Sequence, residues 1–118
     1  METAKNLLSL SDILGAKDTQ YKDVEIPEWP TGGKPGVIRL RSLSAADAQQ
    51  FQQKENEKDA ALLVLVLSAV GEDGTPVFTR GDIERLRDKS LKVILRLQDE
   101  ALRLNGLHPD QKAAAKNV

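Results

Sequence analysis

The sequence predicts an α+β protein, mostly α, in which an N-terminal antiparallel β-hairpin packs on a C-terminal bundle of about four helices. Three observations predict this class. Apolar and charged residues alternate in the short segments 21–27 and 37–41, as they do in half-buried strands. An apolar segment of helical length follows at 57–70. A Leu-rich segment of helical period then occupies residues 90–104.

Composition limits the classes of function. The 118 residues make one domain, with 17 Lys+Arg, 18 Asp+Glu and a formal net charge of −1, so nucleic acid is not expected as a partner. Cysteine is absent and His108 is the single histidine, which excludes a disulfide, a thiolate nucleophile and a Cys-ligated or multi-His metal site. We expect no cofactor, no membrane span and no signal peptide, and hence a cytoplasmic protein.

The first 20 residues are expected to form an arm with one short helix. Ser11–Gly15 is predicted as a single helical turn, capped by Ser11 and ended by Gly15. Residues 16–20 are expected to form a polar linker.

The hairpin is expected over residues 21–43. Its first strand should end at Pro27, because proline has no N–H to donate to a sheet. The segment 27–36 is rich in Pro and Gly and is predicted to be a loop. The second strand places two aliphatic side chains on one face and Arg39 and Arg41 on the other.

The helical bundle is expected over residues 44–107. Ser44 begins a helix, with Asp47 as the reciprocal partner of a capping box. The segment 57–70 is apolar nearly all round and should form the central helix. A strand competes there, because Leu63–Leu67 also reads as a buried strand.

Two further helices complete the predicted bundle. A capping box at Thr79 and Asp82, flanked by the apolar pair of a hydrophobic staple, begins a short helix. The last helix runs from about Ser90 to Leu104 and ends at an Asn-Gly C-cap. Residues 108–118 are predicted to be a flexible tail, because they have little to bury.

Motif searches do not favour an enzyme. Gly32-Gly33-Lys34 lacks the upstream glycine and the following Ser or Thr of a phosphate-binding loop, so a turn is the better interpretation. His108 has no carboxylate placed near it by local spacing. The acidic pairs at 72–73 and 99–100 are expected on solvated surface rather than in acid–base catalysis.

Several residues are candidates for binding a protein partner. Trp29 lies in a Pro-Glu-Trp-Pro segment, where its indole either covers the core of the hairpin or anchors another protein. Arg39 and Arg41 could bind a phosphate or an acidic peptide, or could simply keep an edge strand charged. The remaining candidate partner-binding residues are Leu97, Leu104 and Leu107.

Four motifs occur in a characteristic order along the chain. They are Val-Glu-Ile-Pro-Glu-Trp at 24–29, the strand-to-helix junction Arg-Leu-Arg-Ser-Leu-Ser-Ala-Ala at 39–46, the turn Glu-Asp-Gly-Thr-Pro-Val-Phe-Thr at 72–79, and Leu-Asn-Gly-Leu at 104–107. Together they resemble the small tail assembly chaperones of long-tailed bacteriophages and prophages, from residue 11 to residue 110. The chain departs from that pattern in its longer loop at 30–36.

The resemblance implies a non-enzymatic chaperone of the host bacterial cytoplasm. Such a protein binds the tape measure protein, helps recruit tail tube subunits and is absent from the mature virion. Many members are also made as a longer product by ribosomal frameshifting, and Ala115-Lys116-Asn117 can be encoded with the slippery run A-AAA-AAC. The implied partners are the tape measure protein and the tail tube protein, with self-association as a further option.

Two other interpretations stay open. One is a different phage structural or adaptor protein, such as a head–tail connector or a small cytoplasmic interaction module. The other is a small enzyme that uses paired carboxylates, which would need a pocket with a strongly perturbed Asp or Glu.

Overall fold

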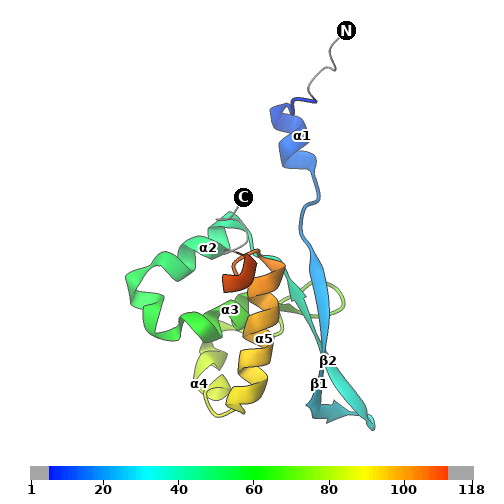
Figure 1. The fold of residues 1–118 in the computed structure, drawn as a ribbon, viewed down its shortest axis with the longest axis vertical. Coiled ribbons are helices and arrows are strands. Elements are labelled where there is room, and N and C mark those ends of the chain that lie inside the picture. Colours follow the sequence, from blue (N-terminus) through cyan, green and yellow to red (C-terminus); the bar gives the residue numbers. More distant parts are fainter. Residues whose placement is uncertain (1–5, 112–118) are drawn as a thin grey trace.

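The computed structural model describes residues 6–111 and confirms the predicted α+β class. Its antiparallel sheet has the order β1-β2-β3, with β1 at Tyr21–Thr31, β2 at Lys34–Arg41 and β3 at Ala69–Val70. The sheet packs on the helices, and the long β1–β2 hairpin forms one side of the molecule (Figure 1).

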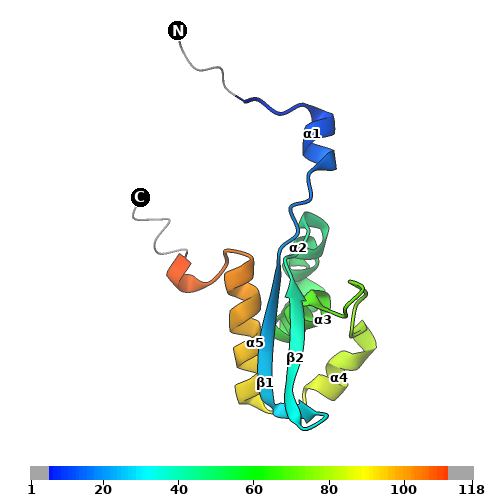
Figure 2. The same ribbon diagram turned by 90° about the vertical axis from the view of Figure 1, so that its right-hand side faces the viewer.

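The described residues also form several helices. In chain order they are α1 (Leu10–Gly15), α2 (Ala45–Gln52), the 3₁₀-helix η1 (Lys54–Asp59), α3 (Ala60–Ser68), the 3₁₀-helix η2 (Arg80–Asp82), α4 (Ile83–Leu86) and α5 (Leu91–Leu104). Figure 2 shows α5 lying along β1, and α3 packs on both α5 and β2. α1 lies apart from this body, beyond the end of the hairpin (Figures 1 and 2).

The core lies between one face of the hairpin and the α3–α5 pair. Val24, Ile26 and Leu40 are buried on that face, as the alternation predicts. They meet α3 and α5, whose largest fully buried side chains include Leu65 and Leu97. The opposite face of the hairpin carries the paired side chains of Asp23 and Arg39.

The hairpin is longer than the sequence predicts, and the expected loop at 27–36 is wrong. β1 continues through both prolines to Thr31, and only Gly32 and Gly33 separate it from Lys34. Both glycines have positive φ, at 58° and 76°, as a two-residue hairpin turn of this kind requires. The register shifts between Ile26 and Thr31, so the prolines occupy an irregularity of an edge strand.

The N-cap of the first helix lies two residues earlier than predicted. Ser9, and not Ser11, is its N-cap, and Ser9 and Asp12 form a reciprocal capping box. Both Ser9 and Ser11 are residues that can cap a helix. Only Ser9 has an acidic residue three positions later, which a capping box requires, so Ser9 is the N-cap.

In the central apolar segment the predicted helix is confirmed over residues 60–68, and the competing strand at Leu63–Leu67 is wrong. The main part of this segment forms α3, as expected for a buried helix, and its last two residues form β3, which pairs with β2. The preceding residues, expected as part of the helix, form η1 instead.

The predicted caps of the bundle are confirmed. Ser44 and Asp47 form a capping box at the start of α2. Thr79 and Asp82 form another at the start of η2, which continues directly into α4. Of the predicted tail, residues 108–111 form a hydrogen-bonded turn in which the Gln111 N–H donates to the His108 carbonyl oxygen at 3.0 Å. The rest of that tail, 112–118, lies outside the described residues.

Candidate partner-binding surface

An apolar groove runs along the surface where α3 packs on α5. It consists of two adjoining hollows that share Ala61 and Gln98. The first, of about 390 Å³, has no charged residue in its lining, which includes Leu43, Phe51, Val64, Leu102 and Leu107. The second, of about 240 Å³, is lined by Leu62, Leu91, Ile94 and Leu95, with Arg87 and Lys89 at its edge. Such grooves are suited to the apolar face of an amphipathic helix.

The C-terminus of α5 positions one wall of the first hollow. Gly106 has a φ of 70°, and the Leu107 N–H donates to the Leu102 carbonyl oxygen at 2.8 Å. The Gly106 N–H donates to the Arg103 carbonyl oxygen at 3.2 Å. These two bonds make a Schellman motif, so the predicted Asn-Gly C-cap is confirmed, and it turns Leu107 back toward the last turn of the helix.

His108 fixes the segment that follows. Its Nε2 lies 2.6 Å from Asp99 Oδ1, and its Nδ1 accepts a hydrogen bond from the Asp110 N–H at 3.2 Å. Arg103 also donates to Asp99, and that bond is the main cause that lowers the pKa of the Asp99 carboxyl. The expectation of no carboxylate near His108 is therefore wrong, because the reversal at Gly106 returns the chain to Asp99.

Trp29 covers part of the core. Its side chain is half-buried against the core cluster, and Lys89 Nζ lies 5.8 Å from the centroid of its ring, within cation–π range. This packing is that of a lid on the core, the first of the two interpretations of Trp29. A contact between Trp29 and a partner stays a prediction.

The neighbouring Glu28 ties the hairpin to α5. Its two carboxylate oxygens accept hydrogen bonds from Arg96 Nη1 and Nη2, each at 2.7 Å. The hydrogen bonds from Arg96 are the largest cause that lowers the pKa of Glu28, to about 2.

The two strand arginines already have carboxylate partners. Arg39 donates to Asp23 through Nε and Nη2 at 2.7 and 3.0 Å, and Arg41 Nη2 lies 3.0 Å from Asp47 Oδ2. The interpretation of their strand as an edge strand is wrong, because β2 lies between β1 and β3. The binding of phosphate or an acidic peptide by these arginines stays a prediction.

The three predicted leucines lie in different environments. Leu97 has no exposed surface and belongs to the core, so it cannot contact a partner in the folded protein. Leu104 is half-buried against the core, and Leu107 lies in the groove with 42% of its surface exposed. Leu91 and Leu95, which the sequence prediction did not name, are 69% and 50% exposed on α5. In the sequence, the only feature that sets these two leucines apart is their position at the margin of the apolar face of α5.

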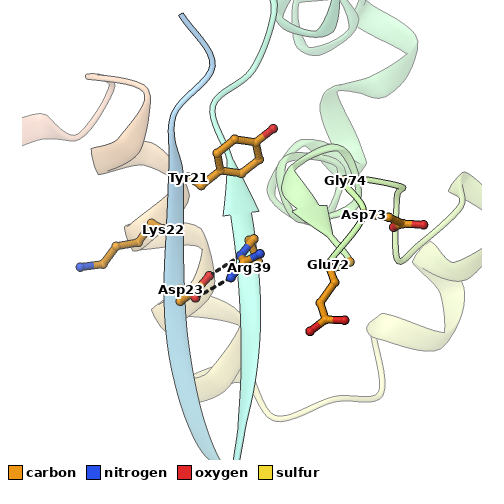
Figure 3. Close-up of a pocket in the computed structure, with 8 residues that line it drawn as sticks. Tyr21, Lys22, Asp23, Arg39, Glu72, Asp73 and Gly74 are labelled. Atoms are coloured by element: carbon orange, nitrogen blue, oxygen red, sulfur yellow. Dashed lines mark hydrogen bonds and ion pairs between the residues drawn. The ribbon is translucent and has the colours of Figure 1, made fainter. Parts of the chain in front are cut away.

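A wider hollow of about 670 Å³ lies on the outer face of the hairpin, beside the turn at 71–74 (Figure 3). Its charged groups have local roles. Asp23 is paired with Arg39, and Asp73 points away from that pair. The Asp73 carboxylate accepts hydrogen bonds from the Thr75 hydroxyl and N–H, which lower its pKa and keep it ionised. A carboxyl with a lowered pKa is a poor general acid at neutral pH.

Residues 6–111 contain no group of three or more His, Asp or Glu side chains placed to hold a metal ion. None of the helices described is long and apolar enough to cross a bilayer.

The fold and this surface define a small α+β protein with an apolar surface groove. No protein-family model and no curated protein matches the sequence. Among solved structures, the chain is similar to the tail assembly chaperone of bacteriophage HK97, with a TM-score of 0.60 and 26% sequence identity. The match covers 80% of this chain and 91% of that chain. The predicted resemblance to the phage tail assembly chaperone family is confirmed, and a general chaperone role is supported.

Proposed function

We propose that the protein is a phage tail assembly chaperone that binds the tape measure protein and helps recruit tail tube subunits. It acts in the host bacterial cytoplasm and is absent from the mature virion. The observation that carries the proposal is the similarity to the HK97 chaperone over 80% of this chain. A longer frameshifted product is part of the proposal. The codons for residues 115–117, which lie outside the described residues, test this product. Any codon that breaks the run A-AAA-AAC would contradict frameshifting at this position.

The second hollow of the groove is the proposed contact with the tape measure protein. Leu91 and Leu95 are exposed there beside Leu62, and together they offer a short apolar track along α5. An amphipathic segment of the partner would place its apolar stripe on this track and so be shielded from water.

The size of this contact suits a chaperone that must leave. Burying the exposed parts of Leu91 and Leu95 contributes roughly 1–2 kcal/mol each, a combined factor of about thirty to a thousand in affinity. Many such contacts along a long partner protect it, while each one alone is readily exchanged.

Co-expression tests the proposal. The full chain should increase the soluble fraction of the tape measure protein from the same genome, and no increase would contradict the proposal. The double variant Leu91→Asp, Leu95→Asp should lose this effect. A matched control, Val37→Asp with Val77→Asp, changes two side chains that are 57% and 55% exposed on the outer face of the sheet, and should retain it. If both double variants lose the increase in soluble tape measure protein equally, the groove is not the contact surface.

A further inference from the structure

One face of α5 carries a regular seam along the groove. Its residues follow one another at spacings of four, three and four, and all of them line the groove: Leu91, Leu95, Gln98 and Leu102. These are the spacings of the seam of a coiled coil, in which one helix packs along another. The seam is about 16 Å long, since an α-helix rises about 1.5 Å per residue, and it can hold about three turns of a partner helix.

Gln98 is the polar residue of this seam. It is half-buried at the point where the two hollows meet, and its side-chain amide has no hydrogen-bond partner among residues 6–111. Asn105, the other amide in the lining, is engaged on both sides. Its Oδ1 accepts a hydrogen bond from the Leu43 N–H at 2.7 Å, and its Nδ2 donates to the Ala101 carbonyl oxygen at 2.8 Å. Asn105 therefore holds the fold together, whereas the amide of Gln98 is available to a partner.

A partner that covers the groove changes the surroundings of the Gln98 amide. Water satisfies this amide while it is uncovered, but a helix along the seam displaces that water. A uniformly apolar helix leaves the amide without hydrogen bonds, which lowers the affinity roughly five- to a hundredfold. A helix with one polar side chain at the same level restores those bonds. In coiled coils, a single polar residue in an apolar seam fixes the register in this way.

The rest of the groove sets the remaining chemistry of the partner. The first hollow has no charged side chain in its lining, so the stripe that enters it should be uncharged. At the other end of the groove, Lys89 borders the second hollow. Among the described residues its ammonium group contacts the ring of Trp29 and no carboxylate. Charge complementarity therefore favours an acidic side chain at that end of the partner helix.

We propose that Gln98 hydrogen-bonds one uncharged polar side chain in the otherwise apolar stripe of a partner helix, and that this helix carries an acidic residue at the end nearest Lys89. The polar side chain is that of Asn, Gln, Ser or Thr. Gln98 thereby determines which segment binds and in which register. The inference rests on the proposed function, in which the partner helix is a segment of the tape measure protein, and it adds the sequence pattern that such a segment must have.

Synthetic helical peptides test the proposal. The parent peptide has a stripe of four leucines at spacings of four, three and four and a Glu at one end. In four further peptides a Gln replaces one leucine of the stripe, at each position in turn. Fluorescence anisotropy measures the binding of each labelled peptide to the full chain. The wild-type chain should bind one Gln peptide roughly fivefold or more tightly than the parent peptide. It should bind the other three more weakly than the parent peptide, because they lose a leucine and leave Gln98 unpaired.

Variants of Gln98 give the decisive comparison. Gln98→Leu makes the seam uniformly apolar, so the parent peptide should become the tightest ligand. Gln98→Ala removes the amide without adding apolar surface, and it should lose the preference for the Gln peptide even if Gln98→Leu aggregates. Gln49→Leu is the matched control. It makes the same change at an exposed position of α2 outside both hollows, and it should keep the wild-type order of peptides.

The acidic end of the partner is tested with the preferred peptide. Replacing its Glu by Lys should weaken binding to the wild-type chain about two- to fivefold, as expected for an exposed ion pair. Lys89→Gln should remove this difference. Equal binding of both peptides by the wild-type chain would contradict the contact with Lys89.

Three outcomes overturn the role of Gln98. The first is a wild-type chain that prefers no Gln peptide to the parent peptide. The second is an unchanged order of peptides in folded Gln98→Leu and Gln98→Ala. The third is binding of no peptide, because the seam is then covered by a second copy or holds no helix.

The peptide experiment and the co-expression experiment fail separately. A chain that increases the soluble fraction of the tape measure protein but does not discriminate among the peptides keeps the proposed function and loses this inference. A chain that discriminates among the peptides without increasing that fraction keeps the role of Gln98 and loses the proposed partner.

Discussion

Leu95 and Leu97 lie two residues apart on α5, yet they should respond oppositely to truncation. Leu97 has no exposed surface and packs in the core, so Leu97→Ala leaves a cavity. Buried leucines truncated in this way cost about 2.7–5.0 kcal/mol, a large share of a total stability of roughly 5–15 kcal/mol. Leu95 is 50% exposed, so Leu95→Ala loses only about 1 kcal/mol of transfer free energy and encloses no cavity.

Urea unfolding followed by circular dichroism measures the first half of this prediction. The midpoint should fall far more for Leu97→Ala than for Leu95→Ala, with an unchanged denaturant slope. The soluble fraction of co-expressed tape measure protein measures the second half. There, at a temperature where both variants are folded, Leu95→Ala should be the weaker chaperone. Equal stability losses, or a larger chaperone defect in folded Leu97→Ala, would refute the division of α5 into a core face and a contact face.

Four further substitutions probe the frame that holds the groove. Ser68 Oγ is buried and has no hydrogen-bond partner among the described residues, so Ser68→Ala should raise the free energy of unfolding by about 0.5–2 kcal/mol. Ser44→Ala, which removes a cap, should lower it by about 1 kcal/mol in the same urea titration. A Cβ on Gly36 would lie 2.1 Å from the Trp29 carbonyl oxygen, so Gly36→Ala should cost about 1–3 kcal/mol and lower the melting temperature, whereas Gly15→Ala, which meets open space, should not. The pKa of Glu28 is lowered from 4.5 to about 2, so its contribution to stability is present above pH 4.5 and is lost as the pH falls toward 2. Glu28→Gln should show a shallower loss of stability across that interval, and identical acid titrations would disprove the role of the Glu28–Arg96 pair.

Local sequence signals, namely helix caps and the alternation of apolar residues in strands, made much of the fold predictable. The capping boxes at Ser44 and Thr79 and the C-cap at Gly106 each depend on residues within one or two helical turns. The alternation in the hairpin identified Val24, Ile26 and Leu40 as inward-facing because the period of a strand is two. Each of these signals is complete within a few residues of sequence.

Apart from the choice of N-cap in the first helix, the errors occurred where a contact joins separate segments of the chain. The extension of β1 through two prolines depends on its edge position in the sheet, which the sequence of β1 does not state. His108 meets Asp99 only because the chain reverses at Gly106. β3 is a strand only because β2 lies beside it, since two residues carry no strand pattern of their own.

The candidate surface was hard to predict for a more general reason. Hydrophobic periodicity reports which side chains need an apolar neighbour, but not whether that neighbour belongs to the same chain. Leu97 and Leu95 both lie on the apolar side of α5 in sequence terms, and only the three-dimensional packing shows that one is covered and the other is not. The leucines of the N-terminal arm illustrate the same point. They belong to a capped helix, but their apolar side chains are exposed and do not pack on the core. In the proposed chaperone, the residues expected to bind a partner are therefore apolar side chains that have the pattern of core residues but stay exposed.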